Sequence, residues 1–173
     1  MNDQQIILIL RLVHITLGVF WVGSVLNFVL FIAPAAKASG PEGGKFMHQF
    51  GKTSYPVAMA VSGLVNILTG VLLIWKLSNG FEPAWFRSSY ARVLSSGSGL
   101  AIIAFIIGFT VNRPTATRMT KIGDAVARTA APATNDQTKE LLMLQNRMIR
   151  TSNIIAILLT LAVISMSICR YVG

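Results

Sequence analysis

The sequence predicts an all-α integral membrane protein: a bundle of four transmembrane helices that forms one domain over residues 1–173. Composition is the first reason, because 53% of the residues are hydrophobic and only 12% are charged. Length is the second, since a helix needs about 20 apolar residues to cross a hydrocarbon core of about 30 Å. Four apolar segments reach that length, and they cover residues 6–33, 54–76, 93–112 and 151–171.

The connections between these segments contain further predicted helix. The first helix is expected to end at Pro34, and the chain to become helical again from about Lys45. The third helix is expected to end at Pro114, and the stretch that follows, up to Asp136, to contain the most flexible part of the chain. Residues 137–150 have apolar side chains at helical spacing and predict an amphipathic helix continuous with the fourth span.

A faint internal repeat relates the two halves of the chain. Lys-Thr-Ser at 52–54 opens the second span, and Arg-Thr-Ser at 150–152 opens the fourth. A proline follows the first and the third span, at Pro34 and Pro114. Duplication of a helical hairpin is one origin of such a pattern, and chance is the other.

The basic residues that give the net charge of +9 flank the spans, so they do not indicate a nucleic-acid-binding patch. Ten basic residues lie on one side of the predicted membrane and five on the other. Basic residues prefer the cytoplasmic side, so both termini are expected to face out and the two basic loops to face the cytoplasm and anionic lipid. We expect the inner membrane of a bacterium as the location. The ten are Lys37, Lys45, Lys52, Arg113, Arg118, Lys121, Arg128, Lys139, Arg147 and Arg150.

Polar residues from all four spans fall at a similar predicted depth in the outer half of the membrane. A rise of about 1.5 Å per residue places His14 at this depth, level with Asn66 and Thr69. The small and hydroxylated residues 95–99 and Met166 fall there as well. Ionisable groups inside a membrane are costly and usually mark a functional site, so this layer is the predicted site.

The first span presents a face that suits haem. Arg11, His14, Gly18 and Trp21 follow one another at spacings of three, four and three residues, which places them on one side of a helix. Imidazole is a frequent axial ligand of haem iron, so His14 is the predicted metal ligand and haem b the predicted cofactor. Gly18 would leave a gap for a flat macrocycle, and Trp21 would form its wall.

Three other residues complete the predicted haem site. Arg11, or Arg92 at the outer end of the third span, would pair with a propionate. Met166 lies at a height that suits a sixth ligand, and Asn66 would line the site. The function predicted from this set is electron transfer or a redox accessory role. No catalytic residue is predicted, and whether the protein is an enzyme stays open.

Two other functions remain open. Small and hydroxylated residues are common where membrane helices pack, so His14 could be a packing residue of a non-catalytic accessory or assembly subunit. Copper handling across the membrane is the third possibility, because imidazole also binds copper. His48 is expected to be a solvated or interfacial histidine on the cytoplasmic side. Membership of a larger complex is possible, and so is a homo-oligomer, because the small residues 95–99 suit helix association.

The pattern of His14, Trp21 and Gly23, followed by an apolar run and a proline, resembles small bacterial membrane proteins. It is similar to the membrane domain of the copper-resistance D family and to the J-type, haem-associated protoporphyrinogen oxidases. The resemblance implies a four-helix bundle whose first-helix histidine serves a haem or a metal. In the J-type oxidases a lysine on a later helix accompanies that histidine. The third span here contains no lysine, so the resemblance does not extend to the oxidase activity.

Overall fold

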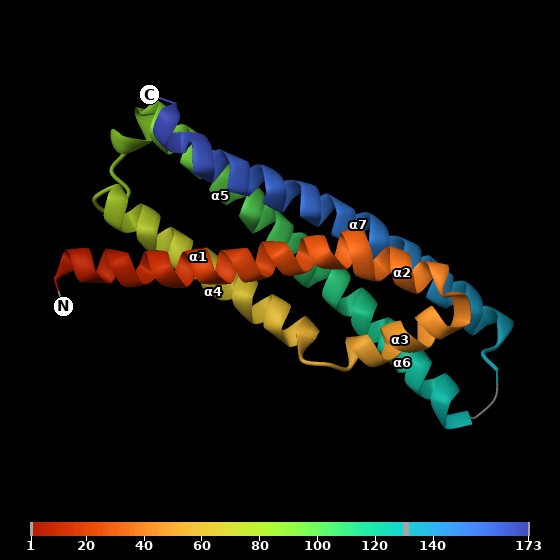
Figure 1. The fold of residues 1–173 in the computed structure, drawn as a ribbon. Helices are drawn as coiled ribbons and strands as arrows, with labels where there is room; N and C mark the ends of the chain where they lie inside the picture. The colour runs from red at the N-terminus through yellow and green to blue at the C-terminus, as the bar shows by residue number, and fades with distance from the viewer. Residues whose placement is uncertain (1, 130–131, 173) are drawn as a thin grey trace.

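Four long helices make up most of the molecule (Figure 1). The computed structural model describes residues 2–129 and 132–172, and within these ranges the chain contains helices and turns but no strand. Each long helix belongs to a helical stretch that is long and apolar enough to cross a membrane. The four are α1 (Asp3–Asn27), α4 (Tyr55–Leu77), α5 (Ser89–Ile107) and α7 (Asn135–Ile168).

Shorter elements extend or connect the long helices. Two five-residue π-helices continue α1 and α5, and further α-helices follow them without a break. Two 3₁₀ turns lie at the end of the bundle opposite to the two π-helices. The shorter elements are η1 (Phe28–Ile32), α2 (Ala33–Ala38), α3 (Gly40–Gly51), η2 (Trp85–Arg87), η3 (Gly108–Asn112), α6 (Arg113–Thr129) and η4 (Cys169–Tyr171).

The two prolines that were expected to end helices do not end them. Pro34 lies in the first turn of α2 and Pro114 in the first turn of α6, and each follows a π-helix directly. A proline inside an α-helix removes one hydrogen bond and its ring collides with a carbonyl one turn earlier. The wider π turn shifts the register of these carbonyls, so the helix axis continues past the proline. Helical structure therefore runs from residue 3 to 38 and from residue 89 to 129.

The stretch after Pro114 is thus more ordered than the sequence predicted. Most of it is α6, and residues 132–134 before α7 lie outside a helix. Helix α7 runs without a break from Asn135 to Ile168, so residues 137–150 are helical and continuous with the fourth span. Its first turn begins with a capping box, in which the side chains and backbone amides of Thr134 and Gln137 bond reciprocally.

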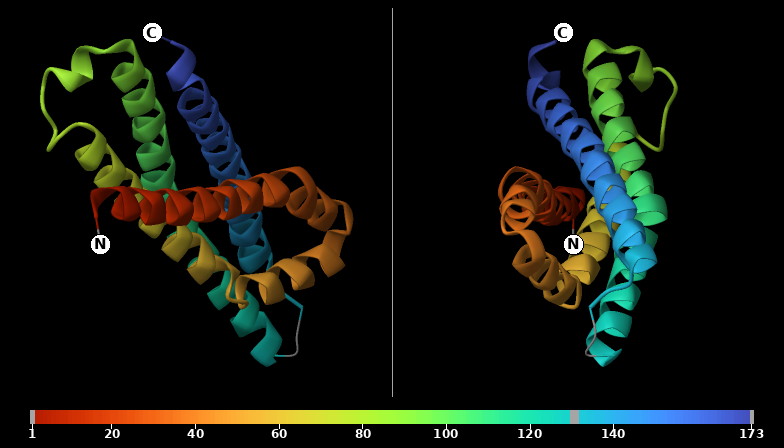
Figure 2. Two further views of the ribbon diagram at one scale, coloured as in Figure 1. Left: turned by 60° about the vertical axis from the view of Figure 1, so that its left-hand side comes forward. Right: turned by 90° about the vertical axis from the view of Figure 1, so that its right-hand side faces the viewer.

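The molecule is built from two helical hairpins. Helix α1 packs chiefly on α4, and α5 packs chiefly on α7, while contacts between the two hairpins are fewer. In Figure 1 the start of α1, the end of α7 and the connector between α4 and α5 lie at the left, and the α2–α3 and α6–α7 connections lie at the right. Figure 2 shows that α1 crosses α5 and α7 steeply. Each hairpin contains a π-helix, an Xaa-Pro step and a helical extension at the same end, as a duplicated hairpin would.

The core is small and lies where the two hairpins meet. Trp21 of α1, Ala104 of α5 and Leu159 of α7 are among its buried members. In contrast, many large apolar side chains are exposed, including Leu12, with 59% of its surface accessible, and Val19, with 71%. A polypeptide in water buries such side chains, whereas in lipid they face a solvent as apolar as themselves.

Candidate functional site: the His14–Asn66–Thr69 cluster

His14 is held against helix α4 by its Nδ1 atom. That atom lies 2.9 Å from the backbone oxygen of Asn66 and 3.2 Å from Oγ1 of Thr69. A carbonyl oxygen only accepts hydrogen bonds, so Nδ1 carries the proton and donates. The neutral imidazole then has its free lone pair on Nε2, and Nε2 makes no hydrogen bond within the described part of the chain.

Asn66 completes a reciprocal contact between the helices. Its side-chain Nδ2 donates to the backbone oxygen of His14 at 2.6 Å, while its own backbone oxygen accepts from the imidazole. Thr69 donates its hydroxyl to carbonyls of its own helix, at 2.8 Å to Val65 and 2.9 Å to Asn66. Asn66 and Thr69 are buried and His14 is half-buried. The predicted association of these three residues is present in the structure.

Two glycines allow the helices to approach at this level. A Cβ atom on Gly70 would lie 2.9 Å from Cε1 of His14, so the imidazole rests against the backbone of α4. A Cβ atom on Gly18 would lie 3.0 Å from Nδ2 of Asn66. The space beside Gly18 was predicted to receive a macrocycle, but the amide of Asn66 fills it. Sequence alone could not show this, because it does not reveal which helix faces Gly18.

Trp21 is part of the core and does not line an open gap. It has 5% of its surface exposed, and its ring meets the ring of Phe105 edge-on at 6.2 Å between centroids. A Cβ atom on Gly63 would lie 3.1 Å from Cε2 of Trp21. Trp21 therefore joins α1 to α4 and to α5.

The remaining predicted site residues lie apart from this cluster. Met166 packs with its Cγ atom 3.3 Å from the Cβ position of Gly97, inside the second hairpin. Arg11 is exposed. Arg92 is exposed as well, and its guanidinium lies 3.5 Å from the hydroxyl of Ser89, its neighbour on the same helix. The structure joins neither arginine to His14 through a hydrogen bond or an ion pair within the described residues.

The hydroxyls of residues 95–99 serve mainly their own helix. Ser96 donates to the carbonyl of Arg92 at 2.8 Å, and Ser98 donates to that of Leu94 at 3.0 Å. Ser95 differs, because its buried Oγ has no hydrogen-bond partner in the described chain. This part of the predicted polar layer therefore belongs to the packing between α5 and α7.

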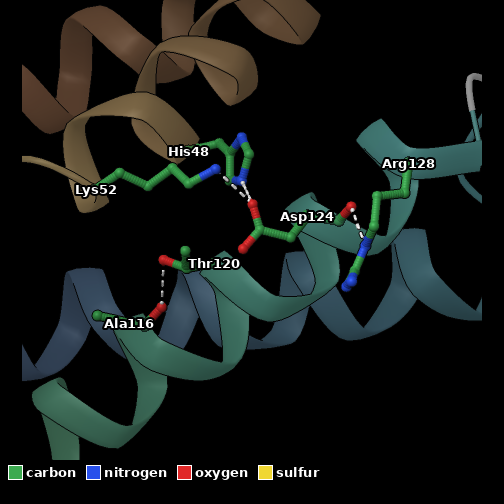
Figure 3. A network of polar contacts seen from close by, with 6 residues as sticks. All are labelled: His48, Lys52, Ala116, Thr120, Asp124 and Arg128. Atoms are coloured by element: carbon green, nitrogen blue, oxygen red, sulfur yellow. Dashed lines mark hydrogen bonds and ion pairs between the residues drawn. The ribbon is translucent and has the colours of Figure 1, made fainter.

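His48 belongs to a cluster that the sequence analysis did not identify (Figure 3). Its Nε2 lies 3.0 Å from Oδ1 of Asp124, and the same oxygen accepts from Nζ of Lys52 at 2.6 Å. Only 16% of the His48 side chain is accessible, so of the two expected states, solvated or interfacial, the structure excludes a fully solvated histidine. Gly123 makes room for the ring, since a Cβ atom there would lie 2.4 Å from its Cδ2.

This cluster joins α3 of the first hairpin to α6 of the second. His48 and Lys52 are four residues apart and share a helix face, which is a signal that the sequence does contain. Their partner Asp124 is 76 residues from His48, and no local pattern identifies it.

Comparisons with known proteins found no relative from which a function could be assigned. No family model matches the chain, and neither the curated proteins nor the solved structures contain a match. Within residues 2–129 and 132–172, no group of three or more His, Cys, Asp or Glu side chains is placed to hold a metal ion. A metal held by His14 alone would need its other ligands from a cofactor or a second chain.

Proposed function

We propose that the chain is a multi-pass membrane protein that binds haem b through Nε2 of His14 and serves in electron transfer or as a redox accessory subunit. One observation carries the proposal: Nδ1 is bound to the backbone oxygen of Asn66 at 2.9 Å, while Nε2 makes no hydrogen bond in the described chain. Histidines that ligate metals almost always donate their other ring N–H to a carbonyl or a carboxylate. Haem iron, when bound, would carry one electron at a time.

The donor atom suits haem, but the predicted cradle does not. Asn66 fills the space beside Gly18, and Trp21 is buried in the core. The proposal therefore rests on His14, whose orientation Asn66 and Thr69 fix. It assigns no second axial ligand within the chain, because Met166 packs against Gly97 in the other hairpin. Arg11, one turn from His14 on the exposed face of α1, is the candidate partner for a propionate.

An absorption spectrum tests the proposal, and the second histidine gives a matched control. Protein purified after haem-replete expression is expected to show a Soret band. The substitution His14→Ala removes the only proposed ligand and is expected to abolish the band, whereas His48→Ala is expected to leave it unchanged. A colourless wild-type protein would overturn the proposal, and so would a band that survives His14→Ala.

A second candidate is a non-catalytic accessory or assembly subunit, in which His14 only packs. The reciprocal bond from Nδ2 of Asn66 to the backbone oxygen of His14 favours it, because this contact joins α1 to α4 without a cofactor. The expected result is then a colourless protein that co-purifies with a larger complex and tolerates His14→Gln. Copper handling predicts a third result, in which haem-free protein contains copper that is lost on His14→Ala.

The proposed topology places both termini outside and the α2–α3 and α6–α7 ends in the cytoplasm. It rests on the ten basic residues at that end, which the positive-inside rule assigns to the cytoplasm. Single cysteines in a Cys169→Ser background test it with a thiol reagent that does not cross membranes. Glu82→Cys is expected to react in intact cells and Lys37→Cys only after permeabilisation. The opposite labelling pattern would reverse the topology.

A further inference from the structure

A basic concavity lies where the helix of the third span leaves its apolar part. Its volume is about 510 Å³. It is lined by Phe109, Arg113, Pro114, Thr117, Arg118 and Lys121, so three cations and one aromatic ring face the same space. No carboxylate is among these lining residues. The concavity lies about 100 residues along the chain from His14, on the other hairpin, and it is independent of the proposed haem site.

The helix register explains why these residues face one space. Phe109, Arg113, Thr117 and Lys121 follow one another at four-residue intervals, and residues four apart are neighbours on a helix surface. The Arg113 guanidinium lies over the Phe109 ring, 5.1 Å from its centroid. This cation–π contact holds a charged group directly beside an apolar surface.

The charge of the concavity is only partly neutralised. Arg118 donates from Nε and Nη2 to the two carboxylate oxygens of Glu140, at 2.6 and 3.1 Å. That pair joins α6 to α7 and fixes the position of the guanidinium. Arg113 and Lys121 are exposed, and neither forms a salt bridge within the described residues. Two positive charges thus remain available beside a fixed third.

The apolar surface next to these charges determines the kind of ligand. Phe109 has 49% of its surface exposed and Ile106 has 51%. Both lie before Arg113 in the sequence, in the apolar part of the same helix. A ligand that binds both the charged and the apolar surface needs an anionic group and an apolar chain. We propose that this concavity binds the phosphate headgroup of an anionic phospholipid, with Arg113 and Lys121 as its ligands and an acyl chain along Phe109 and Ile106. The proposal requires membrane insertion but does not depend on haem.

Titration of the detergent-purified protein with lipid, followed by native mass spectrometry, tests this site. Wild-type protein is expected to bind phosphatidylglycerol in preference to phosphatidylcholine. The double substitution Arg113→Gln/Lys121→Gln is expected to weaken phosphatidylglycerol binding on the order of 30-fold, given the contribution of each basic residue near an anionic headgroup. The control Lys37→Gln/Lys139→Gln removes two exposed charges from the same end of the bundle and is expected to change binding less than two-fold.

Three results would overturn the proposal. Equal weakening by the two double variants would show diffuse attraction, and equal binding of both lipids by the wild type would show no headgroup site. Displacement of phosphatidylglycerol by inorganic phosphate at millimolar concentration would show a site for free anions. If the double variant does not fold, the single substitution Lys121→Gln replaces it. Lys121 is exposed, and this substitution removes one of the two proposed ligands. The single variant is expected to lose about five-fold in affinity, and unchanged affinity would overturn the proposal.

Discussion

The two hairpins of this protein reach the same architecture with different chemistry. In the first, α1 and α4 are joined inside the apolar region by His14, Asn66 and Thr69. In the second, α5 and α7 approach through small residues, and a Cβ atom on Gly97 would lie 3.0 Å from the backbone oxygen of Ala162. The corresponding position to His14, twenty residues before the proline, is Leu94.

The comparison indicates that helix pairing here does not require a histidine at this position. The second hairpin packs at least as extensively as the first, and interhelical side-chain hydrogen bonds lie at the end of this hairpin where α6 begins. There Asn112 donates to Oγ of Ser152 at 3.0 Å and accepts from Thr151. The proposed haem ligation would explain why the first span carries an ionisable residue, which is costly inside a membrane.

The largest expected effect is the loss of close packing in the second hairpin. Gly97→Leu places a side chain against Ala162 and Met166, and overpacking of this kind is expected to cost about 3 kcal/mol of unfolding free energy. Gly99→Leu is the control, because no atom lies within 4 Å of a Cβ there. Unfolding in mixed detergent measures both. Equal losses would show that the close approach of the two helices at Gly97 does not set the effect.

Asn66→Leu is expected to have the next largest effect, and it separates packing from ligation. It removes the bond from Nδ2 to the backbone oxygen of His14, and buried interhelical hydrogen bonds in membranes contribute about 0.6 to 1.7 kcal/mol. The backbone oxygen that accepts from Nδ1 remains, so the proposed Soret band is expected to persist. Stability and absorbance together therefore measure the two roles of the cluster. Loss of the band with full stability would contradict both assignments.

The corresponding change in the second hairpin is Asn112→Leu. It removes the bonds to Ser152 and Thr151 at the end of the hairpin where α6 begins, and we expect a loss of about 0.5 to 1 kcal/mol. Asn112 is half-buried, so water compensates part of the loss. The same unfolding assay measures it beside Asn66→Leu. A larger loss for Asn112 would indicate that its contacts contribute more to helix pairing than the His14–Asn66–Thr69 cluster does.

The smallest expected effect is at the contact between the hairpins. Asp124 lies on α6, which carries five charged residues beyond the apolar part of its helix. The bonds from Lys52 and His48 hold the pKa of the Asp124 carboxyl below its ordinary value. The contacts of the Asp124 carboxylate with Lys52 and His48 therefore stabilise the fold above about pH 4. This contribution is lost as the pH falls through the lowered pKa of Asp124. Asp124→Asn is expected to lower stability slightly at neutral pH and to flatten its decline in acid.

Thermal unfolding as a function of pH checks this last prediction. The control is Glu42→Gln, which removes an exposed carboxylate whose ion pair with Lys45 is local to α3. This variant is expected to leave the acid decline unchanged. An identical pH profile for wild type and Asp124→Asn would show that the contact between α3 and α6 does not contribute to stability.

Composition and span length determined the helical class and the positions of the four long helices, because a bilayer-length apolar run has few other folded states. The common depth of His14 and Thr69 was predicted from helical rise, but the rise alone does not determine that the two side chains face each other. The effect of the prolines did not follow from local rules, because a π turn can absorb what an α-helix cannot.

Only the tertiary structure decided which surfaces meet. It showed that Asn66 occupies the space beside Gly18, that Trp21 is core, and that Met166 belongs to the other hairpin. It also brought His48 to Asp124 across 76 residues. Helical periodicity fixes which residues share a face, but the rotation of each helix against its neighbours depends on the packing of all four. For that reason the sequence identified His14, and the structure identified what surrounds it.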